Sequence, residues 1–326
     1  MTDLTVSAES WPIRGGFVIS RGAKTSADVL RVTLRDGNVT GQSECVPYAH
    51  YGESCDSVTA QIESIRKTLQ QGLDRAQLQS ALPPGAARNA LDCALWDLQA
   101  KASGRRVWEL LDLPSPQPLT TAYTLSLASP EAMHKAALEN AHRPLLKLKL
   151  GGDGDIERVR AVRAAAPRAR LILDANEGWD MDRYQQLVPE LLPLDIDMIE
   201  QPLPEGADDA LLSLPRPIPI CADESCHTIE SLQRIVGRYD MVNIKLDKTG
   251  GLSAALRLRD AAQAAGLGIM VGCMLATSLA MAPATLLAQG AMVVDLDGPL
   301  LLEEDRQPGL RFENNLVYPP GRDLWG

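Results

Sequence analysis

Lysine and carboxylate residues recur along this chain, each near the end of a short apolar segment, and from Lys149 to Lys245 they do so at even intervals of 22 to 26 residues. The series consists of Lys147, Lys149, Asp174, Glu200, Asp223, Lys245, Asp295 and Asp297. Any one of these charges could belong to a solvated loop end or a structural ion pair. Eight charges in register indicate one site, and lysines beside carboxylates suit proton transfer next to a bound cation.

Eight short apolar segments carry these residues, and a helix-like segment follows most of them. They cover residues 122–127, 145–150, 170–173, 196–199, 218–221, 241–245, 268–271 and 292–296. Strands that alternate with helices eight times predict a (β/α) barrel. The alternative is a doubly wound α/β sheet, which the lack of a glycine-rich phosphate turn after the first strand disfavours. The chemistry of a barrel lies at the carboxyl ends of its strands, where these charges stand.

Three of the carboxylates suit a metal ion. Asp174, Glu200 and Asp223 end successive segments, so we expect them to converge on one point. Hard oxygen ligands without nearby cysteine or histidine suit Mg²⁺, which keeps positions open for water and substrate. His227 lies close to Asp223, but we interpret it as a structural residue. One Mg²⁺ per subunit is therefore predicted.

Side chains alternate between the two faces of a strand, which assigns the remaining charges to the barrel interior. Lys147 and Lys149 point the same way, into the barrel mouth, and so do Asp295 and Asp297. Two ammonium groups side by side are costly unless carboxylates or a substrate compensate them. The pattern therefore predicts a mouth lined by charges of both signs.

The first third of the chain has a different pattern. Residues 29–34 and 39–45 are strand-like, and the Asp36-Gly37-Asn38 sequence between them is a hairpin signal. Residues 56–71 predict one helix. Residues 86–98 predict a stronger one, with apolar positions three and four apart and Gly104 just beyond its end. This part therefore reads as an α+β domain.

A proline-rich stretch at residues 114–118 marks the expected domain boundary. We expect an α+β capping domain over residues 1–115 and a catalytic barrel over residues 116–302. The tail, residues 303–326, holds little periodic structure, and we expect it to pack back on the first domain.

Composition excludes several classes of partner. The net charge of −10 argues against nucleic acid and against an anionic membrane surface. No basic segment followed by an apolar core opens the sequence, and no apolar run approaches the roughly 20 residues that span a bilayer. The six cysteines are scattered without a CxxC pair, which favours free thiols in a reducing compartment. We expect a cytoplasmic protein with a small-molecule substrate. The oligomeric state stays open, and a homo-oligomer is one possibility.

As a set, the motifs resemble the enolase superfamily, its muconate-lactonising-like subgroup, and within it the bacterial L-Ala-D/L-Glu (dipeptide) epimerases. They are Lys147-Leu148-Lys149, Asp174-Ala175-Asn176-Glu177-Gly178-Trp179, Glu200-Gln201-Pro202-Leu203, Ala222-Asp223-Glu224-Ser225, the segment from Asn243 to Gly251, and Ala94-Leu95-Trp96-Asp97-Leu98. The likeness spans essentially the whole chain. It implies a (β/α)7β barrel under an N-terminal α+β capping domain.

The resemblance also implies a mechanism. Mg²⁺ on the three carboxylates binds the substrate carboxylate, and Lys147 adds positive charge to the same oxygens. Lys149 and Lys245 act as acid and base on opposite faces of the α-carbon, so that the stereocentre inverts. Burial, Mg²⁺ and Lys147 should lower the lysine pKa toward neutrality. Lys248 could contend with Lys245, but as a loop residue it is expected to support the charge balance.

Further residues are expected to contact the substrate. The resemblance implies that Asp295 and Asp297 hold the free α-ammonium group of a dipeptide. Thr124 matches a substrate-contacting position, and simple strand packing is an equal interpretation. In the first capping loop, either Arg21 or Lys24 is expected to contact an acidic substrate side chain. Arg21 could form a bidentate contact with the carboxylate, whereas Lys24 could supply only a point charge.

A second capping loop, residues 48–53, is expected to close over the site. The implied physiological role is the recycling of cell-wall peptides.

Two other hypotheses stay open. One is a different subgroup reaction, by a cycloisomerase, an o-succinylbenzoate synthase or an N-acyl amino acid racemase, which Asp295 and Asp297 oppose because they would repel an acidic or acylated group. The other is a non-catalytic scaffold, which the complete set of lysines and carboxylates opposes.

Overall fold

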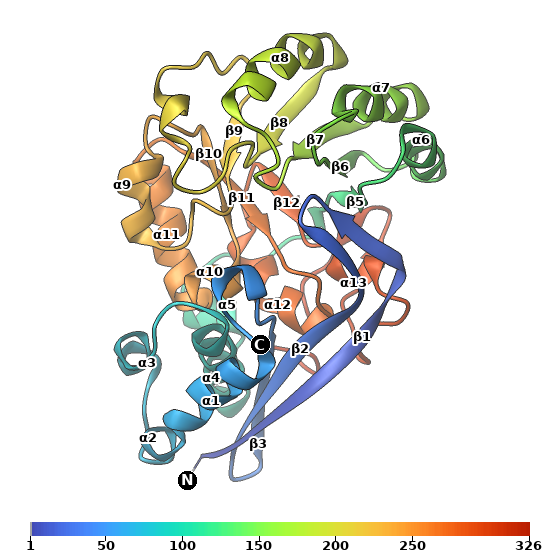
Figure 1. The fold of residues 1–326 in the computed structure, drawn as a ribbon. Helices are drawn as coiled ribbons and strands as arrows, with labels where there is room; N and C mark the ends of the chain where they lie inside the picture. Colours follow the sequence, from blue (N-terminus) through green and yellow to red (C-terminus); the bar gives the residue numbers. More distant parts are fainter. Residues whose placement is uncertain (1) are drawn as a thin grey trace.

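A long antiparallel sheet runs along one side of the N-terminal domain (Figure 1). In the computed structural model, which describes residues 2–326, β1 (Asp3–Ile19), β2 (Gly22–Asp36) and β3 (Val39–Cys45) pair in that order. The predicted hairpin is confirmed, with Asp36 opposite Val39. The sequence did not indicate β1, because only Leu4 and Ile13 of its residues are buried and no clear alternation results.

Helices cover one face of this sheet. They are α1 (Cys55–Ser64), α2 (Arg66–Gln70), α3 (Arg75–Ala81), α4 (Ala86–Ser103) and α5 (Val107–Leu110). The single helix predicted over residues 56–71 is wrong in one detail, since Ile65 separates α1 from α2. The prediction for α4 is confirmed, and Gly104 ends it with a left-handed φ of 69°. A Cβ on Gly41 of β3 would lie 2.4 Å from the Ala94 carbonyl oxygen, so only glycine lets α4 pack this closely.

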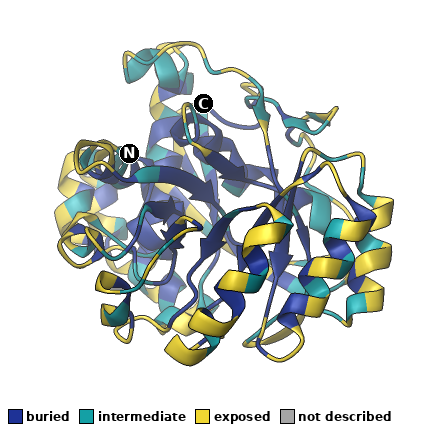
Figure 2. Cartoon of the chain, turned by 90° about the horizontal axis from the view of Figure 1, so that it is seen from above, coloured by how far each residue is buried: buried dark blue, intermediate teal, exposed yellow. Residues whose placement is uncertain are grey.

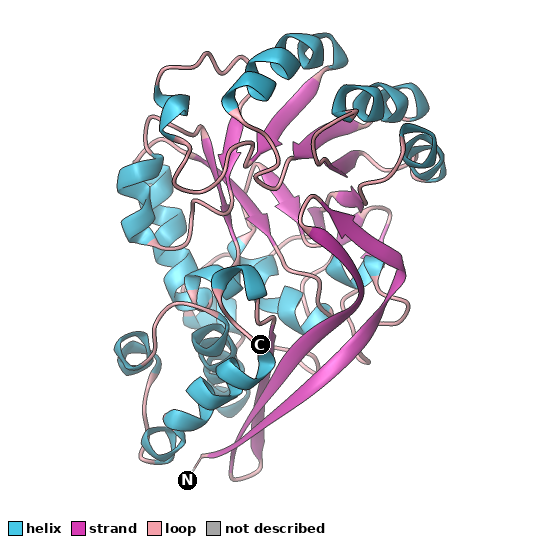
Figure 3. Cartoon of the chain, in the orientation of Figure 1, coloured by secondary structure: helices cyan, strands magenta, loops and turns pink. Residues whose placement is uncertain are grey.

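The second domain is a barrel of eight parallel strands in sequence order (Figure 3). They are β5 (Tyr123–Leu125), β6 (Leu145–Lys149), β7 (Arg170–Asp174), β8 (Ile196–Glu200), β9 (Ile220–Ala222), β10 (Met241–Ile244), β11 (Gly268–Gly272) and β12 (Val293–Asp295). The Ala122 amide donates to the Val294 carbonyl oxygen at 2.8 Å and links the first strand to the last. The predicted capped barrel is confirmed.

Helices surround the barrel (Figure 2). They are α6 (Pro130–Glu139), α7 (Asp155–Ala165), α8 (Met181–Leu191), α9 (Leu232–Ile235), α10 (Leu246–Thr249), α11 (Leu252–Ala264), α12 (Ser278–Leu287) and α13 (Gly298–Leu301). Those on the outside, α6, α7, α8, α9 and α11, keep their exposed faces outward, whereas α10, α12 and α13 have no exposed residue. A separate apolar cluster takes one residue from each strand or its start: Ala122, Leu145, Ile172, Met198, Cys221, Met241, Met270 and Val293. Strand alternation then places Lys147 and Lys149 beyond this apolar layer, at the mouth.

The C-terminal tail contacts both domains. Its short strands β13 (Phe312–Glu313) and β14 (Leu316–Val317) pair with each other, and β14 pairs with β4 (Leu119–Thr120). The Trp325 indole then donates to the Cys93 carbonyl oxygen of α4 at 3.0 Å. Within residues 2–326, no helix is both long and apolar enough to cross a membrane.

Candidate active site

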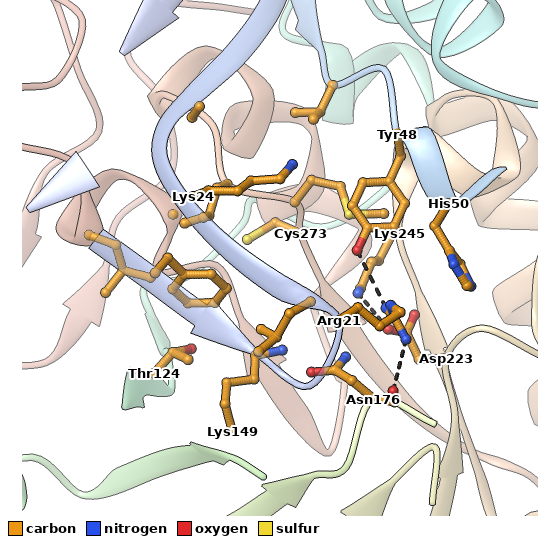
Figure 4. Close-up of a pocket in the computed structure, with 18 of the residues that line it drawn as sticks. Arg21, Lys24, Tyr48, His50, Thr124, Lys149, Asn176, Asp223, Lys245 and Cys273 are labelled. Carbon is orange, nitrogen blue, oxygen red and sulfur yellow. Dashed lines mark hydrogen bonds and ion pairs between the residues drawn. The ribbon is translucent and has the colours of Figure 1, made fainter. Parts of the chain in front are cut away.

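A cavity of about 460 Å³ opens where the carboxyl ends of the barrel strands meet the capping loops (Figure 4). Nine of the residues predicted for the site line it: Arg21, Lys24, Thr124, Lys147, Lys149, Asp223, Lys245, Asp295 and Asp297. Asp174 and Glu200 do not line it, since both are fully buried and lie among the lysines. The structure therefore brings the predicted residues to one place.

Two lysines enter this cavity from opposite sides. Lys149 ends β6, and Lys245 directly follows β10, four strands away in the eight-stranded barrel. Strands four apart in such a barrel face each other across its axis. Figure 4 shows the two side chains on different walls of the cavity. A small molecule between them would therefore meet one amino group on each side.

Short ion pairs connect the lysines of β6 to three carboxylates. Lys149 Nζ lies 2.6 Å from Asp174 Oδ2. Lys147 Nζ lies 3.1 Å from the same oxygen, 2.7 Å from Glu200 Oε2 and 2.7 Å from Asp295 Oδ2. All of these groups are buried, so each charge depends on its neighbours for compensation.

Asp223 is held by two lysines, one on each carboxylate oxygen. Lys245 Nζ lies 2.6 Å from Oδ2, and Lys248 Nζ lies 2.6 Å from Oδ1. Lys248 also donates to the Asn243 carbonyl oxygen at 3.0 Å and does not line the cavity. Its place thus suits a fixed counter-charge to Asp223 rather than a contact with a ligand.

The pKa of Lys245 departs from the expected direction. Burial lowers it, but the Asp223 and Glu200 carboxylates outweigh burial, so the pKa lies above its ordinary value. The expectation of a lowered lysine pKa is therefore wrong for Lys245 while it stays bonded to Asp223. Conversely, burial and the neighbouring Asp174 together raise the pKa of Glu200 to about 8.

The predicted metal ligands lie close to one another and to lysines, since the charge of Asp223 acts on the pKa of both Asp174 and Glu200. Among residues 2–326, no three Asp, Glu, His or Cys side chains form a ready-made metal site. The ammonium of Lys147 instead contacts both Asp174 and Glu200, and the binding of a metal ion by the three carboxylates stays a prediction. The donor set fits a cation, since Glu200 Oε2 is buried beside the Lys147 ammonium at 2.7 Å and, among the described residues, forms no regular hydrogen bond.

The other predicted contacts lie on the wall formed by β5 and β12. Asp297 Oδ2 accepts a hydrogen bond from the Thr124 amide at 2.6 Å, so the backbone of Thr124 orients this carboxylate. Asp295 Oδ2 is bonded to Lys147, while its Oδ1 is buried without a hydrogen-bond partner among the described residues. Burial and the charge of Asp295 together raise the pKa of Asp297 to about 7.

Arg21 and Lys24 differ sharply in their surroundings. Arg21 donates to Glu224 Oε1 at 2.6 Å, to Glu177 Oε2 at 2.9 Å and to the Asn176 carbonyl oxygen at 2.9 Å. Lys24 has no ion pair among the described residues, and its Nζ lies 5.4 Å from the centre of the Tyr48 ring. Lys24 is therefore the cation at the cavity that is free to meet a further anion.

Sequence reasoning missed Glu177 and Glu224. Both stand in the quoted motifs, one or more residues past a strand end, where strand alternation no longer predicts a direction. Glu224 is buried and Glu177 nearly so, and both bind Arg21 of the cap. His227 contacts the Glu224 carbonyl oxygen at 2.8 Å and packs against Tyr51.

Solved structures similar to this chain share its whole architecture. An enolase family member from Agrobacterium tumefaciens, with homology to dipeptide epimerases and with bound sodium and L-Ala-L-Glu, is 54% identical with a TM-score of 0.98, and each chain covers 100% of the other. A dipeptide epimerase from Methylococcus capsulatus, complexed with Mg and L-Arg-D-Lys, is 31% identical with a TM-score of 0.89 over 98% of this chain and 97% of that one.

Two curated relatives are equally similar but differ in activity. The L-Ala-D/L-Glu epimerase of Escherichia coli (strain K12) is 46% identical over 98% of this chain and 100% of its own length. The N-acetyl-D-glutamate racemase of a Pseudoalteromonas species is 46% identical over 91% of this chain and 95% of its own length.

Two family models together match nearly the entire chain. Residues 1–112 match the mandelate racemase / muconate lactonizing enzyme N-terminal domain, and residues 131–322 match the enolase C-terminal domain-like family. Residues 113–130, between the two matches, include the proline-rich stretch 114–118. The chain belongs to the mandelate racemase / muconate lactonizing enzyme family of the enolase superfamily.

Proposed function

We propose that the chain is an isomerase, a Mg²⁺-dependent dipeptide epimerase that inverts the α-carbon of the C-terminal residue of L-Ala-D/L-Glu. The observation that carries this proposal is the placement of Lys149 and Lys245 on opposite sides of one cavity, with carboxylates beside both. An epimerisation needs one group to remove a proton from one face and another to return a proton to the other face.

The chemical difficulty lies in the substrate carboxylate. Removal of the α-proton places a second negative charge on a group that is already anionic. Asp174, Glu200 and Asp223 would hold the Mg²⁺, which when bound supplies charge to stabilise that carboxylate. Lys147 lies between two of these carboxylates and contributes a fixed ammonium charge at the same depth.

The two lysines exchange roles with the direction of reaction. For one epimer, the uncharged amine of Lys149 takes the α-proton while the ammonium of Lys245 donates a proton to the opposite face. For the other epimer the roles are reversed. Each turnover thus leaves one lysine protonated and the other neutral, as microscopic reversibility requires.

Asp297, Asp295 and Lys24 would bind the two ends of the dipeptide. The carboxylates lie on the wall of β12, where a free α-ammonium group would complete the missing hydrogen bond of Asp295 Oδ1. Lys24, which has no other ion pair among the described residues, would meet the acidic side chain of the glutamate. Arg21 is engaged by two carboxylates, which favours Lys24 for this role.

A second candidate is racemisation of an N-acylated glutamate, which the 46% identical N-acetyl-D-glutamate racemase favours. An acetylated nitrogen carries no charge for Asp295 and Asp297 to bind, so we rank this reaction below the first.

The six unpaired cysteines support a reducing compartment, which agrees with a cytoplasmic enzyme that recycles cell-wall peptides.

The test measures α-deuteration by mass spectrometry in heavy water with Mg²⁺. L-Ala-L-Glu, L-Ala-D-Glu, N-acetyl-glutamate and a panel of neutral and basic dipeptides are compared at equal concentration. We expect fastest exchange with the two Ala-Glu epimers. Fastest exchange with N-acetyl-glutamate would favour the racemase, and exchange with none of them would contradict both proposals.

A further inference from the structure

One guanidinium group ties the cap to two separate loops of the barrel. Arg21 lies in the turn between β1 and β2, its Nη1 is 2.9 Å from Glu177 Oε2, and its Nη2 is 2.6 Å from Glu224 Oε1. Glu177 follows β7 and Glu224 follows β9, so the bridge spans the loops on either side of β8. Ser20 strengthens the same contact by donating to the Asn176 carbonyl oxygen at 3.0 Å.

Glu224 in particular needs this cation. Glu224 has a side-chain exposure of 1%, and its second oxygen has no hydrogen-bond partner among the described residues. Loss of Arg21 would leave a buried carboxylate uncompensated directly beside Asp223. The guanidinium is planar and presents separate N–H groups to the two carboxylates, a geometry that a lysine ammonium cannot reproduce on its flexible chain.

The same bridge reaches the second capping loop. Glu177 Oε2 also lies 3.0 Å from His50 Nε2, and Glu177 Oε1 accepts from the Glu205 amide at 2.7 Å. His50 belongs to the 3₁₀ helix Ala49–Tyr51, whose residues line the cavity. Glu177 therefore joins both capping loops to the barrel at one point.

Lys24 depends on this connection for its position. It stands opposite Phe17 at the exposed end of the β1–β2 hairpin, three residues after Arg21. Among the described residues Lys24 has no ion pair, and Figure 4 shows its side chain extending from β2, just after the turn that carries Arg21. The anchor of the hairpin tip thus sets where the Lys24 ammonium lies.

We infer that Arg21 is a positioning residue, which bridges Glu177 and Glu224, holds both capping loops over the cavity and so places Lys24 above the lysine pair. The role of Lys24 rests on the proposed function, whereas the bridge does not. A purely local ion pair would leave the second loop and the binding of neutral dipeptides unchanged.

Hydrogen exchange of the backbone amides, measured without substrate or metal, tests the bridge. In Arg21→Gln we expect residues 20–25 and 49–53 to exchange about tenfold faster or more, since a charge-assisted bridge no longer opposes opening. Arg21→Lys should restore little of this protection. Glu177→Gln should loosen both loops as well, and Arg31→Gln, on the exposed part of the same sheet, should loosen neither. Lys24→Gln should leave exchange unchanged.

Steady-state kinetics add a second readout. Arg21→Gln should raise KM for both neutral and acidic dipeptides, and more for acidic ones because Lys24 also loses its position, whereas Lys24→Gln should raise KM for acidic ones alone. Unchanged loop exchange in Arg21→Gln and Glu177→Gln, or full protection in Arg21→Lys, would overturn the inference. If the wild-type protein epimerises no dipeptide, the proposed function fails while the exchange data still decide the bridge.

Discussion

Lys245 Nζ donates to Asp223 Oδ2 at 2.6 Å, so a proposed proton-transfer group and a proposed metal ligand share one hydrogen bond. Lys149 and Asp174 repeat the relationship on the other side of the barrel at 2.6 Å. The neighbouring carboxylates raise the pKa of Lys245, so this lysine keeps its proton while it is bonded to Asp223. Proton transfer from substrate to Lys245 therefore requires Asp223 to bind another cation.

Replacing either lysine should abolish inversion while leaving part of the exchange chemistry. In Lys149→Met and Lys245→Met we expect epimerisation to fall by at least about 10²- to 10⁴-fold, the contribution of a positioned acid or base. Each variant should still exchange the α-proton of the one epimer whose base remains, measured by mass spectrometry in heavy water. Lys135→Met, on the exposed face of α6, is the matched control. Equal loss of exchange from both epimers in both variants would contradict the two-base assignment.

Metal binding can be tested without activity. A hundredfold excess of Mg²⁺ over its Kd should raise the thermal midpoint of the wild-type protein by about 3–5 °C. Glu200→Gln should abolish this shift, because it removes a proposed ligand, while Glu190→Gln, exposed on α8, should retain it. An identical shift in Glu200→Gln and wild type would remove Glu200 from the ligand set.

Asp297 should make dipeptide binding depend on pH. Burial and the charge of Asp295 raise its pKa to about 7, so its carboxyl is charged above that pH and neutral below it. The KM for L-Ala-L-Glu should therefore rise as the pH falls from 8 to 6, by up to about tenfold per unit. Asp297→Asn should have a high KM with no such step. A step of the same size for N-acetyl-glutamate would show that another group titrates.

Lys24 should determine the preference for an acidic side chain. Lys24→Gln removes a charge but keeps most of the length, so kcat/KM for L-Ala-L-Glu should fall by about tenfold or more, as loss of a charge-assisted contact predicts. The value for L-Ala-L-Leu should stay the same or rise. Equal losses for both substrates would mean that Lys24 does not contact the side chain.

Much of this site could be predicted because it rests on strand periodicity. Lys147 and Lys149 are two residues apart on β6, so the pleat of the strand points both side chains the same way. Residues at the carboxyl ends of the barrel strands also lie at about the same level along the barrel axis. The helix α4 was equally predictable, since its apolar residues recur with helical spacing and glycine ends it.

The rest depends on contacts that no local pattern encodes. β1 is mostly exposed and shows no alternation, so its pairing with β2 could not be predicted. Arg21 and Lys24 are indistinguishable as basic loop residues, and only Glu177 and Glu224, more than 150 residues away, separate their roles. The ion pairs between lysines and buried carboxylates likewise arise where residues on, or directly after, five different strands meet.

The capping helix α4 should influence catalysis through the segment that follows β10. Arg88 donates to the carbonyl oxygens of Thr249 at 2.7 Å and Gly250 at 3.2 Å, directly after the turn that carries Lys245. Arg88→Leu leaves these buried acceptors unpaired, so the free energy of unfolding should fall by about 1–3 kcal/mol in urea titrations. The kcat should fall too, because the backbone beside Lys245 loses its support. Arg257→Leu, whose side chain reaches only Gln79 at the surface, should change neither quantity. If the Arg88→Leu protein is destabilised but keeps the wild-type kcat, the contact of Arg88 with the segment after β10 only holds the two domains together and does not support catalysis.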